Sequence, residues 1–120
     1  MDKDIAKIKS VDFAVRIVNL CRYLRETGRE YALFDQLLRS GTAIGANYRE
    51  ARNAASRKDF INKILIALKE ADETEYWLEL LSKTKYLTEK EYESIKGDCG
   101  ELVSLLTAIV KTAKKNCDGN

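Results

Sequence analysis

The feature that most constrains this chain is the spacing of its apolar residues, which alternates steps of four and three along much of its 120 positions. Side chains at these steps lie on one face of an α-helix, so each such stretch predicts an amphipathic helix. The clearest stretch runs through Phe60, Ile64, Ala67, Ala71, Thr74, Leu78 and Leu81. No proline occurs anywhere to interrupt the pattern. The spacing therefore predicts an all-α protein.

Four such stretches are separated by polar or glycine-containing breaks. We expect helices over residues 10–27, 31–55, 57–85 and from 88 onward. Thr88, with Glu91 three residues later, has the form of a capping box, and Ser56 with Asp59 is a looser version.

The connections between these helices are a few residues long, which makes sequence neighbours antiparallel. The prediction is an antiparallel up-down-up-down four-helix bundle that forms a single domain over residues 1–120. Residues 1–9 and 115–120 are expected to be frayed ends.

Two glycines four residues apart, Gly41 and Gly45, lie inside the second expected helix. A glycine inside a helix costs roughly 0.5–1 kcal/mol relative to alanine, so the pair needs a reason. Small residues allow two helix backbones to approach closely, and Ala67 and Ala71 in the middle of the third helix are the expected partners. Close approach of a ligand or of a neighbouring subunit is the alternative.

Composition limits the class of protein. The chain is 45% hydrophobic and 33% charged, and it contains no apolar run near 18 residues, so we expect no membrane span. The first ten residues lack the apolar core of a secretory signal. Three cysteines, an odd number without metal-ligand spacing, suit a reducing cytoplasm.

The absence of histidine argues against an enzyme. A serine or cysteine nucleophile would lack its common base, and the di-metal sites of helix bundles use histidine together with glutamate. We therefore expect no catalytic residues, no cofactor and no metal. A carboxylate-only Mg²⁺ or Ca²⁺ site around Glu50 and Glu73 is a weaker alternative.

Charge is distributed unevenly although the net charge is only +2. Residues 1–58 carry twelve basic and seven acidic side chains, and residues 59–120 carry nine and twelve. Attraction between packed helices explains part of this, and a basic surface for a polyanion is the sharper hypothesis. The candidate nucleic-acid-binding residues cluster near the second helix break: Arg49, Arg52, Arg57 and Lys58.

Two observations point to contacts outside the core. Helix 10–27 carries apolar residues on more than one face, and Tyr76 and Trp77 lie off the apolar face of the third helix. Tryptophan and tyrosine are enriched in protein interfaces, so we predict that Tyr76 and Trp77 lie between subunits.

Residues 37–81 read LLRSGTAIGANYREARNAASRKDFINKILIALKEADETEYWLELL, and this stretch resembles bacterial four-helix-bundle proteins related to those encoded by intervening sequences in 23S ribosomal RNA genes. The resemblance implies a closed homopentamer without established enzymatic activity. Its recurrent positions are here Asn47, Glu50, Glu73 and Glu75, which we interpret as inter-helix or inter-subunit polar contacts.

A more distant group, the accessory variability determinants of diversity-generating retroelements, is also similar. That similarity implies a pentamer that binds nucleic acid and a reverse transcriptase through a basic surface. The leading hypothesis is thus a cytoplasmic, non-enzymatic homo-oligomer that binds structured RNA or DNA through a repeated basic patch. The rival hypothesis is a protein-interaction scaffold, or an accessory subunit with no direct nucleic-acid role.

Overall fold

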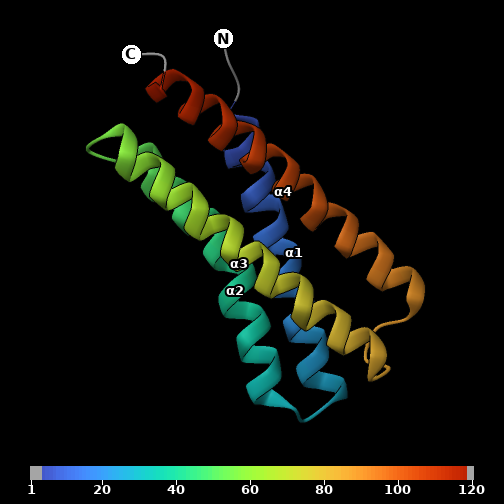
Figure 1. Ribbon diagram of the computed structural model, residues 1–120. Coiled ribbons are helices and arrows are strands. Elements are labelled where there is room, and N and C mark those ends of the chain that lie inside the picture. Colours follow the sequence, from blue (N-terminus) through green and yellow to red (C-terminus); the bar gives the residue numbers. More distant parts are fainter. Residues whose placement is uncertain (1–3, 119–120) are drawn as a thin grey trace.

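The structure, a computed structural model, describes residues 4–118, with side chains through Asn116. It consists of four helices joined by short connections, which are α1 (Ile5–Thr27), α2 (Tyr31–Arg52), α3 (Arg57–Lys83) and α4 (Glu89–Asp118). Each helix packs against its sequence neighbours, α4 closes the bundle against α1, and the diagonal backbones do not approach each other (Figure 1). The predicted all-α four-helix bundle is confirmed.

Two predicted boundaries at the ends of the chain were wrong. Helix α1 begins at Ile5 rather than at residue 10, because the Asp4 side chain caps it by accepting a hydrogen bond from the Lys7 amide at 3.0 Å. Helix α4 continues to Asp118, so residues 115–118 are helical rather than frayed. The rest of the expected frayed ends, residues 1–3 and 119–120, lies outside the described residues.

The inner boundaries follow their caps. The Ser56 hydroxyl accepts a bond from the Asp59 amide at 3.0 Å, and α3 begins at residue 57 as predicted. The capping box before α4 is confirmed by two reciprocal bonds between Thr88 and Glu91, at 2.8 and 3.1 Å. Helix α2 ends at Arg52, three residues earlier than expected, and α3 ends at Lys83. Lys85 then has a φ of 72°, a left-handed conformation that cannot continue the helix.

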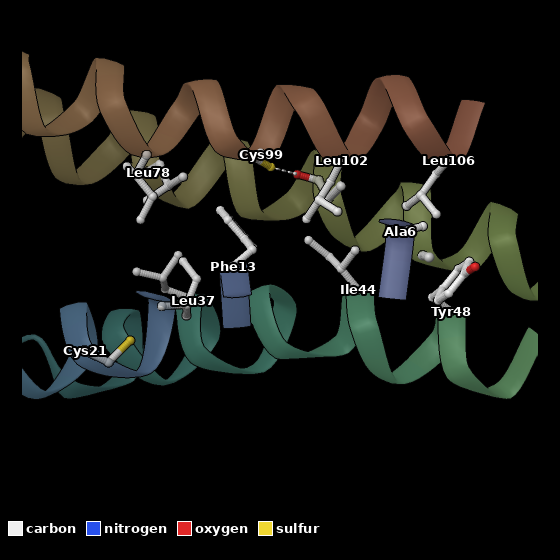
Figure 2. Close-up of a cluster of buried hydrophobic side chains, with 14 of the residues drawn as sticks. Ala6, Phe13, Cys21, Leu37, Ile44, Tyr48, Leu78, Cys99, Leu102 and Leu106 are labelled. Atoms are coloured by element: carbon white, nitrogen blue, oxygen red, sulfur yellow. Dashed lines mark hydrogen bonds between the residues drawn. The ribbon is translucent and has the colours of Figure 1, made fainter. Parts of the chain in front are cut away.

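The core lies between the α1/α2 pair and the α3/α4 pair. Figure 2 shows side chains from both pairs, such as Phe13 and Ile44 on one side and Leu78 and Leu102 on the other, directed into one layer. One polar pair is buried in it, because the Thr74 hydroxyl donates to the Ser40 hydroxyl at 2.9 Å. Burial without such a bond would cost free energy, so this pair favours one alignment of α2 on α3.

The paired glycines of α2 face α1. A Cβ at Gly41 would lie 2.9 Å from two carbons of Ile17, and one at Gly45 would lie 3.2 Å from the Ser10 hydroxyl oxygen. The interpretation as close packing therefore holds, but the expected partners, Ala67 and Ala71 of α3, were wrong. The glycines therefore bring the backbones of α1 and α2 close together.

Candidate nucleic-acid interface

The up-down-up-down order brings four helix termini to one end of the molecule: the starts of α1 and α3 and the ends of α2 and α4 (Figure 1). Side-chain contacts hold these termini together. The Tyr48 hydroxyl of α2 donates to Asp4 before α1 at 2.6 Å, and Leu105 and Ile109 of α4 line a small hollow with the same two residues. Residues remote in sequence thus share one surface here.

Three of the four predicted nucleic-acid-binding residues have free charges at this end. Arg49, Arg57 and Lys58 are exposed, and none of them forms an ion pair with another described residue. Arg52 differs, because its guanidinium is paired with Asp4. The structure therefore keeps the cluster together but neutralises one member.

Sequence reasoning missed further cations at the same end. Lys7 lines a hollow with Arg49, Arg52 and Asn53. Three exposed lysines also lie on the last turns of α4. We call this surface the basic end, and its residues are Lys7, Arg49, Arg52, Arg57, Lys58, Lys111, Lys114 and Lys115. The predicted bundle topology could have revealed these cations, because it places the C-terminal end of α4 beside the α2–α3 turn.

Two of the nearby carboxylates are already engaged, and Asp59 of α3 is left to offset part of this charge. Asp4 is engaged by Arg52, Tyr48 and the Lys7 amide, and Glu50 pairs with Lys63 of α3 at 3.3 Å. A surface of several unpaired lysines and arginines attracts phosphate groups mainly by releasing their counterions, whatever the base sequence.

The four polar positions taken from the family resemblance have separate partners. Glu50 and Glu73 bridge helices, to Lys63 and Arg39 respectively. Asn47 donates to the carbonyl of Ala43 in its own helix at 2.8 Å. Glu75 of α3 faces α4, where burial of the Cys99 thiol and, after it, the charge of Glu75 raise the pKa of that thiol.

Glu73 lies in a small polar network. It accepts a bond from the Trp77 indole at 3.1 Å and pairs with Arg39, which also contacts Glu70 at 3.0 Å. The Trp77 bond, with Arg39 second, holds the pKa of Glu73 below its ordinary value. Hydrogen bonds to Glu70 and, after it, to Glu73 raise the pKa of Arg39. The network therefore links α2 to α3.

Tyr76 and Trp77 differ in exposure. Tyr76 is 57% exposed, whereas Trp77 is half-buried with its ring 4.9 Å from that of Tyr76 in an edge-to-face arrangement. Among the side chains that the structure describes, residues 4–116, no cluster of three or more cysteine, aspartate or glutamate side chains has the geometry of a metal site. Glu50 and Glu73, the weaker metal candidates, are instead engaged in the separate ion pairs just described.

Searching the described helices for a membrane span gives none of sufficient length and apolarity. Fold and surface together define a class: a four-helix-bundle protein with one strongly basic end. The chain belongs to the family of 23S rRNA-intervening sequence proteins, whose model matches residues 3–108. This finding confirms the resemblance.

A solved structure from the same family is similar. It is a crystal structure of a protein with unknown function from the S23 ribosomal protein family of Bacteroides thetaiotaomicron. The two chains are 58% identical, the match covers 88% of this chain and 98% of that one, and the TM-score is 0.87. No functionally curated protein matches the chain.

Proposed function

We propose that this protein is a non-enzymatic homo-oligomer that binds structured RNA or DNA through its basic end. The observation that carries the proposal is the set of unpaired cations that the topology gathers there, with Arg57 and Lys58 at its centre. These side chains contact phosphates without reading bases. A reverse transcriptase or another protein is the further partner that the more distant resemblance implies.

Assembly is part of the proposal because one basic end supplies few phosphate contacts. In a closed ring, the homopentamer implied by the resemblance, the same surface recurs in each subunit and the contacts add. The free Cys21 and Cys99 are buried, which raises the pKa of their thiols to about 11 and about 12. Such unreactive thiols suit the reducing cytoplasm, where we propose that the protein acts.

Two measurements test this function. Light scattering at micromolar concentration should give a mass several times 13.7 kDa, and a gel shift with an RNA hairpin should show binding at low salt. An oligomer that binds no RNA or DNA would favour the scaffold hypothesis, for which the evidence would be a stoichiometric protein partner retained after nuclease treatment. A stable monomer would contradict the assembly.

A further inference from the structure

Helix α1 has a second apolar stripe, directed away from the core. Ile8, Val11 and Val15 are 45%, 42% and 54% exposed, at steps of three and four, and half-buried Val18 continues the line. This spacing is that of a helix face that packs against something. A run of β-branched side chains along an otherwise solvated helix face is the kind of apolar surface that marks an interaction site.

The stripe forms one wall of a groove between α1 and α2. The groove has a volume of about 1000 Å³, and its apolar lining includes Val11, Ala14, Val15, Val18, Gly45 and Ala46. The side chains of Ala14, Gly45 and Ala46 are too small to fill it. We call it the α1/α2 groove.

Two arginines line the groove at different levels, Arg22 from α1 and Arg49 from α2. Neither forms an ion pair with another described residue. Lys63 and Glu50 also line the groove, and they form an ion pair with each other. Asp59 adds one carboxylate. An occupant of matching chemistry is therefore apolar at its centre and acidic at its edges.

Helix α3 of the same chain has that chemistry on its outer face. Residues 70–79 contain five carboxylates and no basic side chain, and two of the five, Asp72 and Glu79, lie on this face, whereas Glu70 and Glu73 pair with Arg39 and Glu75 faces α4. Leu65 and Tyr76 are 42% and 57% exposed there, and Asp72 and Glu79 are exposed without an ion-pair partner among residues 4–116. Lys69 on this face acts on Glu73 of its own helix. We call Leu65, Asp72, Tyr76 and Glu79 the α3 ridge.

We propose that the α3 ridge of a second copy of this chain docks in the α1/α2 groove. The proposal rests on the homo-oligomer of the proposed function and names its two contact surfaces. Tyr76 fills the space over Ala14, Gly45 and Ala46, and the acidic residues of the ridge lie near Arg22 and Arg49.

The contact is heterologous rather than self-complementary. A groove facing a second groove would bring two sets of unpaired arginines together and leave the space between them unfilled. Because α1 and α3 lie diagonally in the bundle, one chain can offer its groove to one neighbour and its ridge to another, as a closed ring requires. Arg57, Lys58 and the α4 lysines stay outside this contact and available to nucleic acid.

A mixing experiment tests the pairing. One variant loses the groove (Val11→Glu with Val15→Glu) and another loses the ridge (Leu65→Lys with Tyr76→Lys). A control carries two exposed changes outside both surfaces (Tyr23→Glu with Ala108→Glu). Circular dichroism checks that all three remain helical, and sedimentation velocity gives their masses at micromolar concentration.

We expect the wild type and the control to be multimers and each of the other two variants to be a single chain. An equimolar mixture of those two should form a two-chain species, since one still has a ridge and the other a groove. Variants that stay multimeric, or a mixture that stays single-chain, would overturn the pairing while the wild-type multimer stands. A single-chain wild type would overturn both the pairing and the proposed assembly.

Discussion

The two ends of the bundle are built from the same parts, two helix starts and two helix ends, yet they differ in charge. Because helix dipoles oppose each other equally at both ends, the difference comes from side chains. At the end opposite the basic end, charges are matched in number: the five cations Arg25, Arg29, Lys83, Lys85 and Lys90 are accompanied by the six carboxylates Glu26, Glu30, Asp35, Glu89, Glu91 and Glu93, and Arg25 pairs with Asp35. At the basic end, most cations have no described partner. Unmatched charge needs an external counter-charge, which a polyanion supplies.

Reversing charge at the basic end should have the largest effect. Arg57→Glu with Lys58→Glu removes two phosphate contacts, and at 0.1 M salt we expect binding to fall by roughly 50-fold or more, since each contact counts roughly tenfold. Acidic residues suit the first turn of α3, so the fold is retained. Fluorescence anisotropy with two RNA hairpins of unrelated sequence measures the loss, which should be similar for both.

The matched control lies at the opposite end. Arg29→Glu with Lys90→Glu makes the same change in net charge on exposed residues. Binding should change far less than in the basic-end variant. Equal losses in the two variants would mean that net charge, rather than the location of the charge, determines affinity.

The middle of the bundle is common to both ends, and damage there should act through stability alone. Gly41→Ala places a methyl group 2.9 Å from two carbons of Ile17, and overpacking of this kind costs about 1–3 kcal/mol. Urea denaturation measures the free energy of unfolding. Adding Ile17→Ala, which removes both of those carbons, should make the combined loss smaller than the sum of the two single losses, and simple additivity would show that the two side chains do not collide.

Freeing Arg52 from its ion pair with Asp4 should increase the difference in charge between the two ends, with a smaller effect than the preceding variants. Asn caps helices as well as Asp, so Asp4→Asn keeps the start of α1 while removing the charge that pairs with Arg52. Affinity for RNA should rise several-fold, and the slope of log K against log salt should steepen by about 0.9, the value for one added phosphate contact. A fall in affinity would show that the Asp4–Arg52 pair positions the surface instead.

The smallest effect is expected at the matched end, with pH. Bonds from the Thr88 backbone amide and hydroxyl, in that order, lower the pKa of Glu91. A carboxyl whose pKa is lowered by folding stabilises the folded state above its ordinary value of 4.5, and this contribution is lost as pH falls through the lower folded value. Glu91→Gln keeps a capping side chain that does not titrate. The stability difference between wild type and variant, from urea melts at pH 3 to 7, should shrink below pH 4.5, and a difference that stays constant with pH would contradict this role.

The sequence predicted the architecture well because apolar spacing and caps are local. Ser56, Thr88 and the core positions of α3 need no knowledge of the rest of the chain. The face that carries Gly41 and Gly45 was also predicted from the sequence. A pattern on one helix does not identify the neighbouring helix, so the glycines were expected to pack against α3, whereas they pack against α1. The start of α1 was missed because the Asp4 cap lies in a stretch of alternating charges.

The site was less predictable because it depends on what topology brings together. Arg52 is close in sequence to Arg49 and Arg57, but its pairing with Asp4 spans 48 positions and is visible only in the fold. Lys115 lies in a stretch that was expected to fray but is helical as far as Asp118, and Lys111 and Lys114 belong to the basic end only because the fold returns α4 to it.

The most direct test of the central claim is the affinity of the wild-type protein for one RNA hairpin, measured by anisotropy from 50 to 300 mM salt. The account predicts that log K falls linearly with log salt, with a slope corresponding to several phosphate contacts on the assembled basic ends. A slope near zero, or no binding at the lowest salt, would contradict it.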